Sequence, residues 1–143
     1  DAEIDWILRT FDTHEGIRRM ICDLNRLYVN EPALHEGDVV PEGFQWLVGD
    51  DHTNCVIAYI RLTPDRRETI LVISNLTPSP RDNYRLGAPC AGYYKEIFNS
   101  DAYDDYPATG NGGWIDAWWG GQERLPARVR LIIPGNSILV FIR

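Results

Sequence analysis

The side chains best suited to bind a ligand lie in one short stretch of the chain, at Trp114, Asp116, Trp118 and Trp119. Tryptophan rings offer flat apolar faces on which sugar rings stack, and a nearby carboxylate accepts hydrogen bonds from sugar hydroxyls. Glycine-rich segments flank the stretch on both sides, which suits an exposed position. The composition therefore indicates a candidate surface site for a carbohydrate such as a glucan.

The direction of these side chains depends on the local backbone. In a strand, Trp114 and Trp118 share one face with Asp116, whereas Trp119 points to the other. Tryptophan buries a large apolar area, and packing is its commoner role. We therefore expect at least one of the three tryptophans to lie in the protein core or at an interface, and carbohydrate binding stands beside packing as the alternative.

No residues have the spacing of a catalytic or metal-binding motif. The sequence lacks a nucleophile elbow, a phosphate-binding loop, a dinucleotide fingerprint and a zinc-protease helix. His35 has no second histidine at helical spacing. Asp104 and Asp105 are adjacent, whereas glycosidase carboxylates flank a sugar about 5 Å or more apart. We predict no catalytic residue, no metal site and no cofactor.

Composition narrows the class of protein. A chain of 143 residues has the size of one domain, and its net charge of −7 argues against a nucleic-acid-binding surface. Cys22, Cys55 and Cys90 cannot all pair with one another and show no metal-ligand spacing. No signal peptide and no apolar run of membrane-spanning length is apparent. These features predict reduced thiols in a cytoplasmic protein with no membrane partner.

One helix precedes the strands. The pattern predicts it over residues 13–30, where apolar residues recur at three- and four-residue intervals. They are Ile17, Met20, Ile21, Leu24, Leu27 and Tyr28. Asp12 or Thr13 can cap its start, and Asp12 with Glu15 has the spacing of a capping box. Pro32 disfavours helical geometry at the preceding residue, which predicts an end near Asn30.

The rest of the chain predicts seven or eight short strands. Period-two alternation places Val56, Ala58 and Ile60 on one buried face, and likewise Val129, Leu131 and Ile133. The expected strands cover residues 44–48, 55–62, 69–76, 84–86, 93–98, 114–119, 128–133 and 137–142. Short strands separated by turns are typical of an antiparallel sandwich or barrel.

Four sequence blocks carry a resemblance to a known family. They are DLNRLY at 23–28, PALHE at 32–36, GFQW at 43–46 and SNLTPSPRDNYR at 74–85. The chain resembles the segment in which the catalytic barrel of glycogen (1,4-alpha-glucan) branching enzymes, members of the alpha-amylase superfamily, joins a C-terminal β-domain. The likeness continues in order over nearly the whole chain and weakens from Trp114 to Arg124.

The resemblance implies a fold and a division of the chain. It implies a mainly β protein, an antiparallel β-sandwich of the alpha-amylase C-terminal type. One α-helix precedes it, left from a truncated (β/α)8 barrel. Residues 1–36 would be the terminal helix and connector of the barrel, and residues 37–143 the all-β domain.

The resemblance also implies what the chain does not do alone. Branching enzymes cleave an alpha-1,4 glucan through a covalent glycosyl intermediate and transfer the segment to a 6-hydroxyl. Their catalytic carboxylates lie on a barrel that takes about 250 residues, which exceeds this chain. No position here matches those carboxylates, and we expect the fragment to be non-catalytic, with a stabilising role and a possible role in binding glucan.

Two other functions remain open at this point. The chain could be a stand-alone carbohydrate-binding β-sandwich, or the C-terminal domain of another alpha-amylase superfamily enzyme such as a debranching enzyme. The apolar helix and the DLNRLY and PALHE blocks favour the branching-enzyme fragment. Its expected partners are the catalytic barrel of the same polypeptide and, through the parent enzyme, alpha-glucan. Apolar residues at Trp6, Leu8 and Phe11 and on the helix further predict either self-association of the fragment or a helix packed differently from its place in the parent enzyme.

Overall fold

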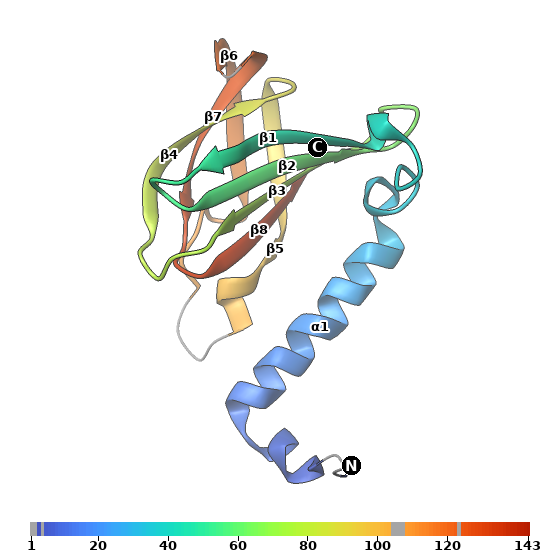
Figure 1. Ribbon diagram of the computed structural model, residues 1–143, viewed down its shortest axis with the longest axis vertical. Helices are drawn as coiled ribbons and strands as arrows, with labels where there is room; N and C mark the ends of the chain where they lie inside the picture. Colours follow the sequence, from blue (N-terminus) through green and yellow to red (C-terminus); the bar gives the residue numbers. More distant parts are fainter. Residues whose placement is uncertain (1–2, 4, 104–107, 123) are drawn as a thin grey trace.

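The fold is mainly β, as predicted. A computed structural model describes residues 3, 5–103, 108–122 and 124–143, which contain one α-helix and eight strands (Figure 1). The helix is α1 (Asp12–Asn30), accompanied by short 3-10 helices η1 (Trp6–Thr10), η2 (Pro32–Leu34), η3 (Pro41–Gly43) and η4 (Ser100–Tyr103). The strands are β1 (Phe44–Asp51), β2 (Val56–Leu62), β3 (Thr69–Asn75), β4 (Arg81–Ala88), β5 (Gly92–Asn99), β6 (Trp114–Gln122), β7 (Leu125–Ile133) and β8 (Ser137–Ile142).

The eight strands of the described chain form one antiparallel sheet in the order β1-β2-β3-β8-β5-β6-β7-β4. The sheet curls, and its two halves face each other across the core (Figure 1). The predicted sandwich is therefore a single curled sheet, in which hydrogen-bonded pairing runs without a break from one layer into the other.

The inner face of the curled sheet forms the main core. Val56, Ala58 and Ile60 of β2 are buried there, as predicted, and every strand adds further apolar side chains. Tyr94 is fully buried, and its hydroxyl donates to the Cys90 carbonyl at 3.0 Å. Burial raises the pKa of Tyr94 to about 12, so this hydroxyl stays neutral at ordinary pH.

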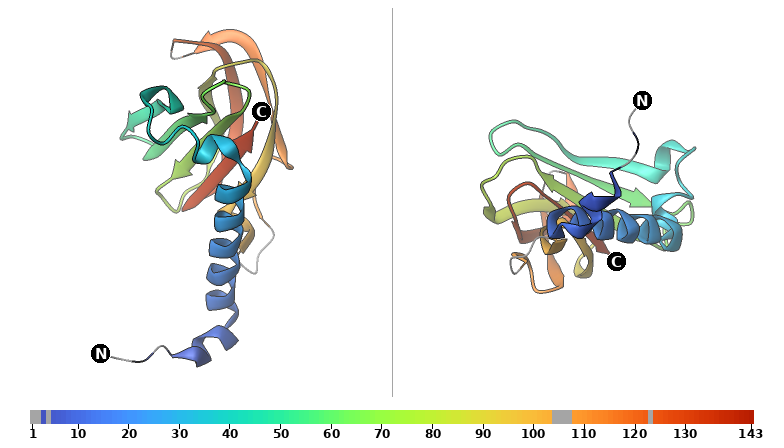
Figure 2. Two further views of the ribbon diagram at one scale, coloured as in Figure 1. Left: turned by 90° about the vertical axis from the view of Figure 1, so that its right-hand side faces the viewer. Right: turned by 90° about the horizontal axis from the view of Figure 1, so that it is seen from below.

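A second apolar layer lies between the outer side of the sheet and α1. Ile70, Val72 and Val140 face this layer, and Met20 and Leu24 pack against it from the helix together with neighbouring side chains. The amino-terminal turns of α1 extend beyond the sheet (Figure 2). The apolar stripe of the helix is therefore divided, because only its carboxyl-terminal half reaches the sheet.

Contacts with η4 and with the connector after α1 position the helix. A side chain at Gly16 would lie 2.5 Å from the Tyr103 carbonyl oxygen, so glycine allows the close approach of α1 and η4. The Tyr103 hydroxyl donates to Asp23 at 2.8 Å. Beyond the helix, the Ala33 amide donates to the Glu68 carboxylate at 2.8 Å and attaches the connector to the sheet.

The helix ends as predicted, but its start differs. It stops at Asn30, one residue before Glu31 and Pro32. The capping-box prediction is wrong, because the N-cap is Phe11 and no side chain caps the helix. Asp12 already lies within the first turn, and Glu15 instead accepts from Arg18 at 2.8 Å.

Several strands are longer than predicted. β6 continues through Gly120 and Gly121, whose φ angles of +146° and +55° allow a register shift after which pairing with β7 resumes. Asn83 has a φ of +55° at a similar shift in β4. The two glycines were expected to end the strand at residue 119, and the structure has a bulge within β6 there instead.

The SNLTPSPRDNYR block forms the turn between β3 and β4, which is held by one buried polar side chain. Asn75 is 1% exposed and donates to the carbonyls of Ser79 and Pro134, both at 2.9 Å. Its carbonyl oxygen accepts from the amide and hydroxyl of Thr77 at 3.1 and 2.9 Å. The amide side chain thereby joins the end of β3 to the turn between β7 and β8. The block has a structural role at this turn.

The same block joins the two edges of the sheet. The Tyr84 hydroxyl of β4 donates to Asp51 of β1 at 2.7 Å, and the Arg81 guanidinium donates to the Asn54 carbonyl at 3.1 Å. The Asn54 amide also donates to Asp51 at 3.0 Å. Burial acts to raise the pKa of Asp51, but the hydrogen bonds from Asn54 and Tyr84 outweigh it and lower that pKa below its ordinary value.

Within the described residues, no helix has the length and apolar character needed to cross a lipid bilayer.

The contact at Asp51 predicts a pH-dependent stability. We expect Asp51→Ala to reduce the unfolding free energy at pH 7 by about 1–2 kcal/mol, as hydrogen bonds to a partly exposed charged group are lost. Because the folded-state pKa lies below the ordinary 3.8, this stabilisation is present above pH 3.8 and disappears as the pH falls through the lower folded-state value. Urea unfolding of both proteins at pH 7 and well below pH 3.8 measures the difference.

Asp50→Ala is the control, since Asp50 is the exposed acid that precedes Asp51 in β1. It should change the unfolding free energy by less than about 0.5 kcal/mol. A deficit for Asp51→Ala that is equal at both pH values would contradict the role of the charge.

Candidate functional site

The predicted ligand-binding stretch lies on β6. Ile115 and Ala117 point into the main core, and the alternating Trp114, Asp116 and Trp118 are exposed on the outer face of the sheet. The period-two prediction for this stretch is therefore confirmed. The structure places two tryptophan rings and one carboxylate in a row along one strand, with about 7 Å between successive members at the usual rise per residue.

Neighbouring strands add an aromatic ring and a cation to this row. Tyr93 of β5 lies opposite Asp116, and its ring centroid is 4.9 Å from that of Trp114. Arg128 of β7 lies opposite Trp118. We call these five residues, Tyr93, Trp114, Asp116, Trp118 and Arg128, the outer aromatic surface.

The arginine is fixed over the second tryptophan ring. The guanidinium carbon of Arg128 lies 5.7 Å from the Trp118 ring centroid, a cation–π contact. Gly120 leaves the space for it, since a side chain there would meet the Arg128 Nε at 3.3 Å. The outer aromatic surface thus combines stacking faces, a hydrogen-bond acceptor and a charged donor.

The four sequence-predicted residues do not all come together. Trp119 lies opposite Ala127, a core residue of β7, and therefore points to the other face of the sheet, as the alternation predicted. Its side chain is 68% exposed, beyond the end of the packed core. Trp114 and Trp118 are 49% and 36% exposed. Hence none of the three tryptophans is buried in the core of this chain, and a place for one of them at an interface stays a prediction.

Tyr93 and Arg128 were missed at the sequence level. Alternation around the buried Tyr94 and Val129 was enough to place both side chains outward. Their proximity to Trp114 and Trp118 depends on which strands are neighbours. In this sheet β6 lies between β5 and β7, and that order comes only from the fold.

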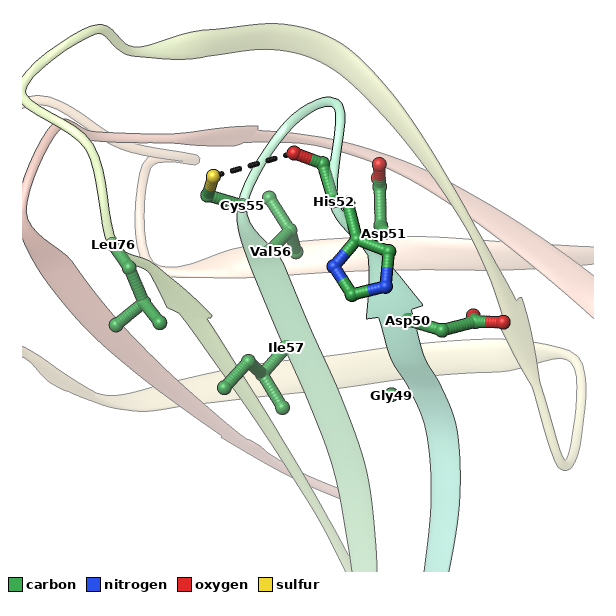
Figure 3. Close-up of a pocket in the computed structure, with 8 residues that line it drawn as sticks. All are labelled: Gly49, Asp50, Asp51, His52, Cys55, Val56, Ile57 and Leu76. Atoms are coloured by element: carbon green, nitrogen blue, oxygen red, sulfur yellow. Dashed lines mark hydrogen bonds between the residues drawn. The ribbon is translucent and has the colours of Figure 1, made fainter.

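A separate hollow of about 240 Å³ lies at the turn between β1 and β2 (Figure 3). Its polar lining includes Asp50, Asp51, His52 and Cys55. The Cys55 thiol donates to the His52 carbonyl at 3.4 Å, and Asp51 already accepts from Asn54 and Tyr84. The hydrogen bonds of Asp51 and Cys55 hold the turn together, so we assign this hollow a structural role.

Catalytic and metal-binding groups do not gather elsewhere in the described part of the chain. No three His, Cys, Asp or Glu side chains in it lie close enough to hold a metal ion. Cys22, Cys55 and Cys90 are unpaired thiols. Asp104 and Asp105, weighed above as a glycosidase pair, lie outside the described residues.

Known proteins match this chain over most of its length. Three relatives are each named 1,4-alpha-glucan branching enzyme GlgB. The protein of Pseudomonas putida (strain KT2440) is 51% identical over 142 residues, covering 98% of this chain and 19% of the relative. That of Pseudomonas fluorescens (strain Pf0-1) is 50% identical over 115 residues, covering 79% and 15%. That of Cupriavidus necator (strain H16) is 46% identical over 143 residues, covering 98% and 19%.

The matched chain is a small part of these relatives, since it spans less than a fifth of their length. In addition, residues 46–143 match the family model described as alpha amylase, C-terminal all-beta domain, and that range begins within β1 and includes β2 to β8. The resemblance stated from the four sequence blocks is confirmed. Since the matched residues build the curled antiparallel sheet almost entirely, this chain belongs to the family of alpha-amylase C-terminal all-beta domains.

Proposed function

We propose that this chain is the C-terminal region of a 1,4-alpha-glucan branching enzyme of glycogen biosynthesis. The observation that carries the proposal is the identity of 46–51% to proteins of that name over 98% of this chain, which is less than a fifth of their length. Cleavage of the alpha-1,4 glucan and transfer to a 6-hydroxyl are then the work of the remaining polypeptide. A cytoplasmic location is part of the proposal, and the three unpaired thiols support it.

In this proposal the chain has two parts. Residues 1–36 are the last helix and connector of the catalytic barrel, and residues 37–143 are the all-β domain. The short helices η2 and η3 occupy the junction, where Arg61 of β2 forms an ion pair with Asp38. That hydrogen bond lowers the pKa of Asp38, so the pair persists at neutral pH.

The uncovered part of α1 supports a partner in the same polypeptide. Ile17 and Ile21 are 58% and 48% exposed, although Met20 and Leu24 from the same stripe pack on the sheet. With the residues before the helix they form what we call the amino-terminal apolar surface: Trp6, Ile7, Leu8, Phe11, Ile17 and Ile21. Exposed apolar patches of this kind mark interaction surfaces. We assign this one to the catalytic barrel, and a free-standing sugar-binding module would have no use for it.

The outer aromatic surface supports a role in holding alpha-glucan. Trp114 and Trp118 are exposed on either side of the exposed Asp116, and aromatic rings with a carboxylate between them are the combination that stacks and hydrogen-bonds sugar rings. In this role the domain would keep a glucan chain near the enzyme without performing chemistry on it.

The assignment of activity is tested on the natural gene product and on this chain in parallel. We expect the natural protein to form new alpha-1,6 linkages from amylose, detected by debranching and chain-length analysis, and the pure 143-residue chain to form none. New branches made by the chain alone, or a natural product of only this length by mass spectrometry, would overturn the proposal.

The amino-terminal apolar surface predicts self-association of the isolated chain. Without the barrel, burial of that surface between copies removes it from water, and we expect oligomers to grow with concentration in analytical ultracentrifugation. Replacing Ile17 and Ile21 with glutamate should return the chain to a monomer. Arg19→Glu, an exposed change of charge on the same helix, should leave association unaltered. A wild-type chain that stays monomeric at high concentration contradicts this expectation.

The glucan role is tested by comparing tryptophans on the two faces of β6. We expect Trp118→Ala to weaken maltoheptaose binding by about tenfold with little change in melting temperature, because an exposed stacking face is lost. Trp119→Ala, on the opposite face, is the matched control and should bind normally. Isothermal titration calorimetry and thermal melts provide both readings. A lowered melting temperature without measurable binding by the wild type would assign Trp118 to packing.

A further inference from the structure

The acidic excess of the chain does not extend to the strands that carry the outer aromatic surface. The whole negative excess of the chain lies in residues 1–80, whereas residues 81–143 hold seven basic and seven acidic side chains. Three of those basic residues, Arg85, Arg128 and Arg130, are exposed on the outer side of β4 and β7. Charge on this side of the sheet therefore differs from the acidic balance of the protein.

Strand register brings two of these arginines face to face. Arg85 of β4 lies directly opposite Arg130 of β7, and both flank buried neighbours, Leu86 and Val129. Like charges placed directly opposite destabilise a sheet. The ion pairs between described residues involve Arg18, Arg26, Arg61 and Arg67 and none of these three arginines.

Protection of the sheet edge explains only part of this arrangement. β4 is an edge strand, and a charge such as Arg85 discourages pairing with another chain. β7 lies inside the sheet between β6 and β4, where no such protection is needed. Edge protection therefore accounts for Arg85 but not for Arg130, and an anion bound between the two arginines supplies a reason for both.

The arginine pair is continuous with the outer aromatic surface. Ala117 lies opposite Val129, so the next position in this antiparallel ladder places Asp116 level with Arg130, and Asp116 is itself opposite Tyr93. Arg85, Arg130, Asp116 and Tyr93 thus form one row across four strands. At about 4.8 Å per strand, Arg130 and Tyr93 are about 10 Å apart along the backbone row.

We propose that Arg85 and Arg130 bind a phosphate monoester attached to a sugar that stacks on the outer aromatic surface. The planar guanidinium group matches phosphate oxygens with two parallel hydrogen bonds. A phosphate monoester carries a charge of about −1.5 to −2 at pH 7, which balances two guanidinium groups, whereas a carboxylate balances one. The ligand is either a phosphorylated alpha-glucan or a free hexose phosphate. The stacking of the sugar on the outer aromatic surface rests on the proposed glucan role, whereas the binding of phosphate by Arg85 and Arg130 does not.

The test compares four ligands by isothermal titration calorimetry on the whole chain at low ionic strength. They are maltoheptaose, maltoheptaose carrying one 6-phosphate, glucose 6-phosphate and inorganic phosphate. We expect the phosphorylated oligosaccharide to bind at least about tenfold tighter than maltoheptaose, the gain typical of a charge-assisted contact. The double variant Arg85→Gln/Arg130→Gln should lose that gain and keep its affinity for plain maltoheptaose.

The control variant is Arg67→Gln, which removes an exposed arginine from the turn before β3. It should retain the preference for the phosphorylated oligosaccharide over maltoheptaose.

Binding of glucose 6-phosphate as tight as that of the phosphorylated oligosaccharide identifies the free sugar phosphate as the ligand. If maltoheptaose fails to bind but glucose 6-phosphate binds and loses affinity in the double variant, the proposed glucan role is wrong and the phosphate site is supported. Equal affinity for plain and phosphorylated oligosaccharide, or an equal loss in Arg67→Gln, overturns the site.

Discussion

The structure depends on burying the apolar inner face of a single sheet. Eight strands joined edge to edge cannot cover that face unless the sheet curls onto itself, which brings β1 and β4 together. Two hydrogen bonds join these edges: the Tyr84 hydroxyl donates to Asp51, and the Arg81 guanidinium donates to the Asn54 carbonyl. The polar groups at the junction are therefore hydrogen-bonded. The four residues come from two segments about 30 positions apart in the sequence, and they are in contact only because the sheet curls.

The centre of the sheet imposes a second requirement. Residues Ile70 to Ile73 of β3 are buried without interruption, which means that both faces of this strand are covered. Its inner side contacts the main core, and its outer side is covered by Leu24, Leu27 and their neighbours from α1. The helix is therefore part of the folded unit, even though its amino-terminal half lies beyond the sheet (Figure 2). A helix that we propose to belong to the catalytic barrel thus also packs on the β-domain.

The outer side of the sheet is apolar beneath α1, but it carries polar and aromatic side chains on β4, β7, β6 and the start of β5. These side chains are tyrosine, tryptophan, aspartate and arginine, and those named above are exposed. Asn75 and Asp51, in contrast, are polar residues whose hydrogen bonds go to turns. Polar chemistry in this domain is thus divided between groups that hold the fold and groups that remain free to meet a ligand. The proposals for glucan and phosphate binding rest on the second set of groups.

Local sequence determined the elements, and tertiary structure decided their neighbours. Pro32 ended the helix, and alternation placed Trp114 and Trp118 on one face of their strand and Trp119 on the other, because backbone geometry sets side-chain direction within a strand. Glycine at 120 and 121 predicted a strand end but produced a bulge, because pairing with β7 resumes beyond it. The contact of Tyr93 with Trp114, and the opposition of Arg85 and Arg130, followed from a strand order that joins distant segments. Such pairings depend on which sheet edges bury the most apolar surface together, and that is a property of the whole chain.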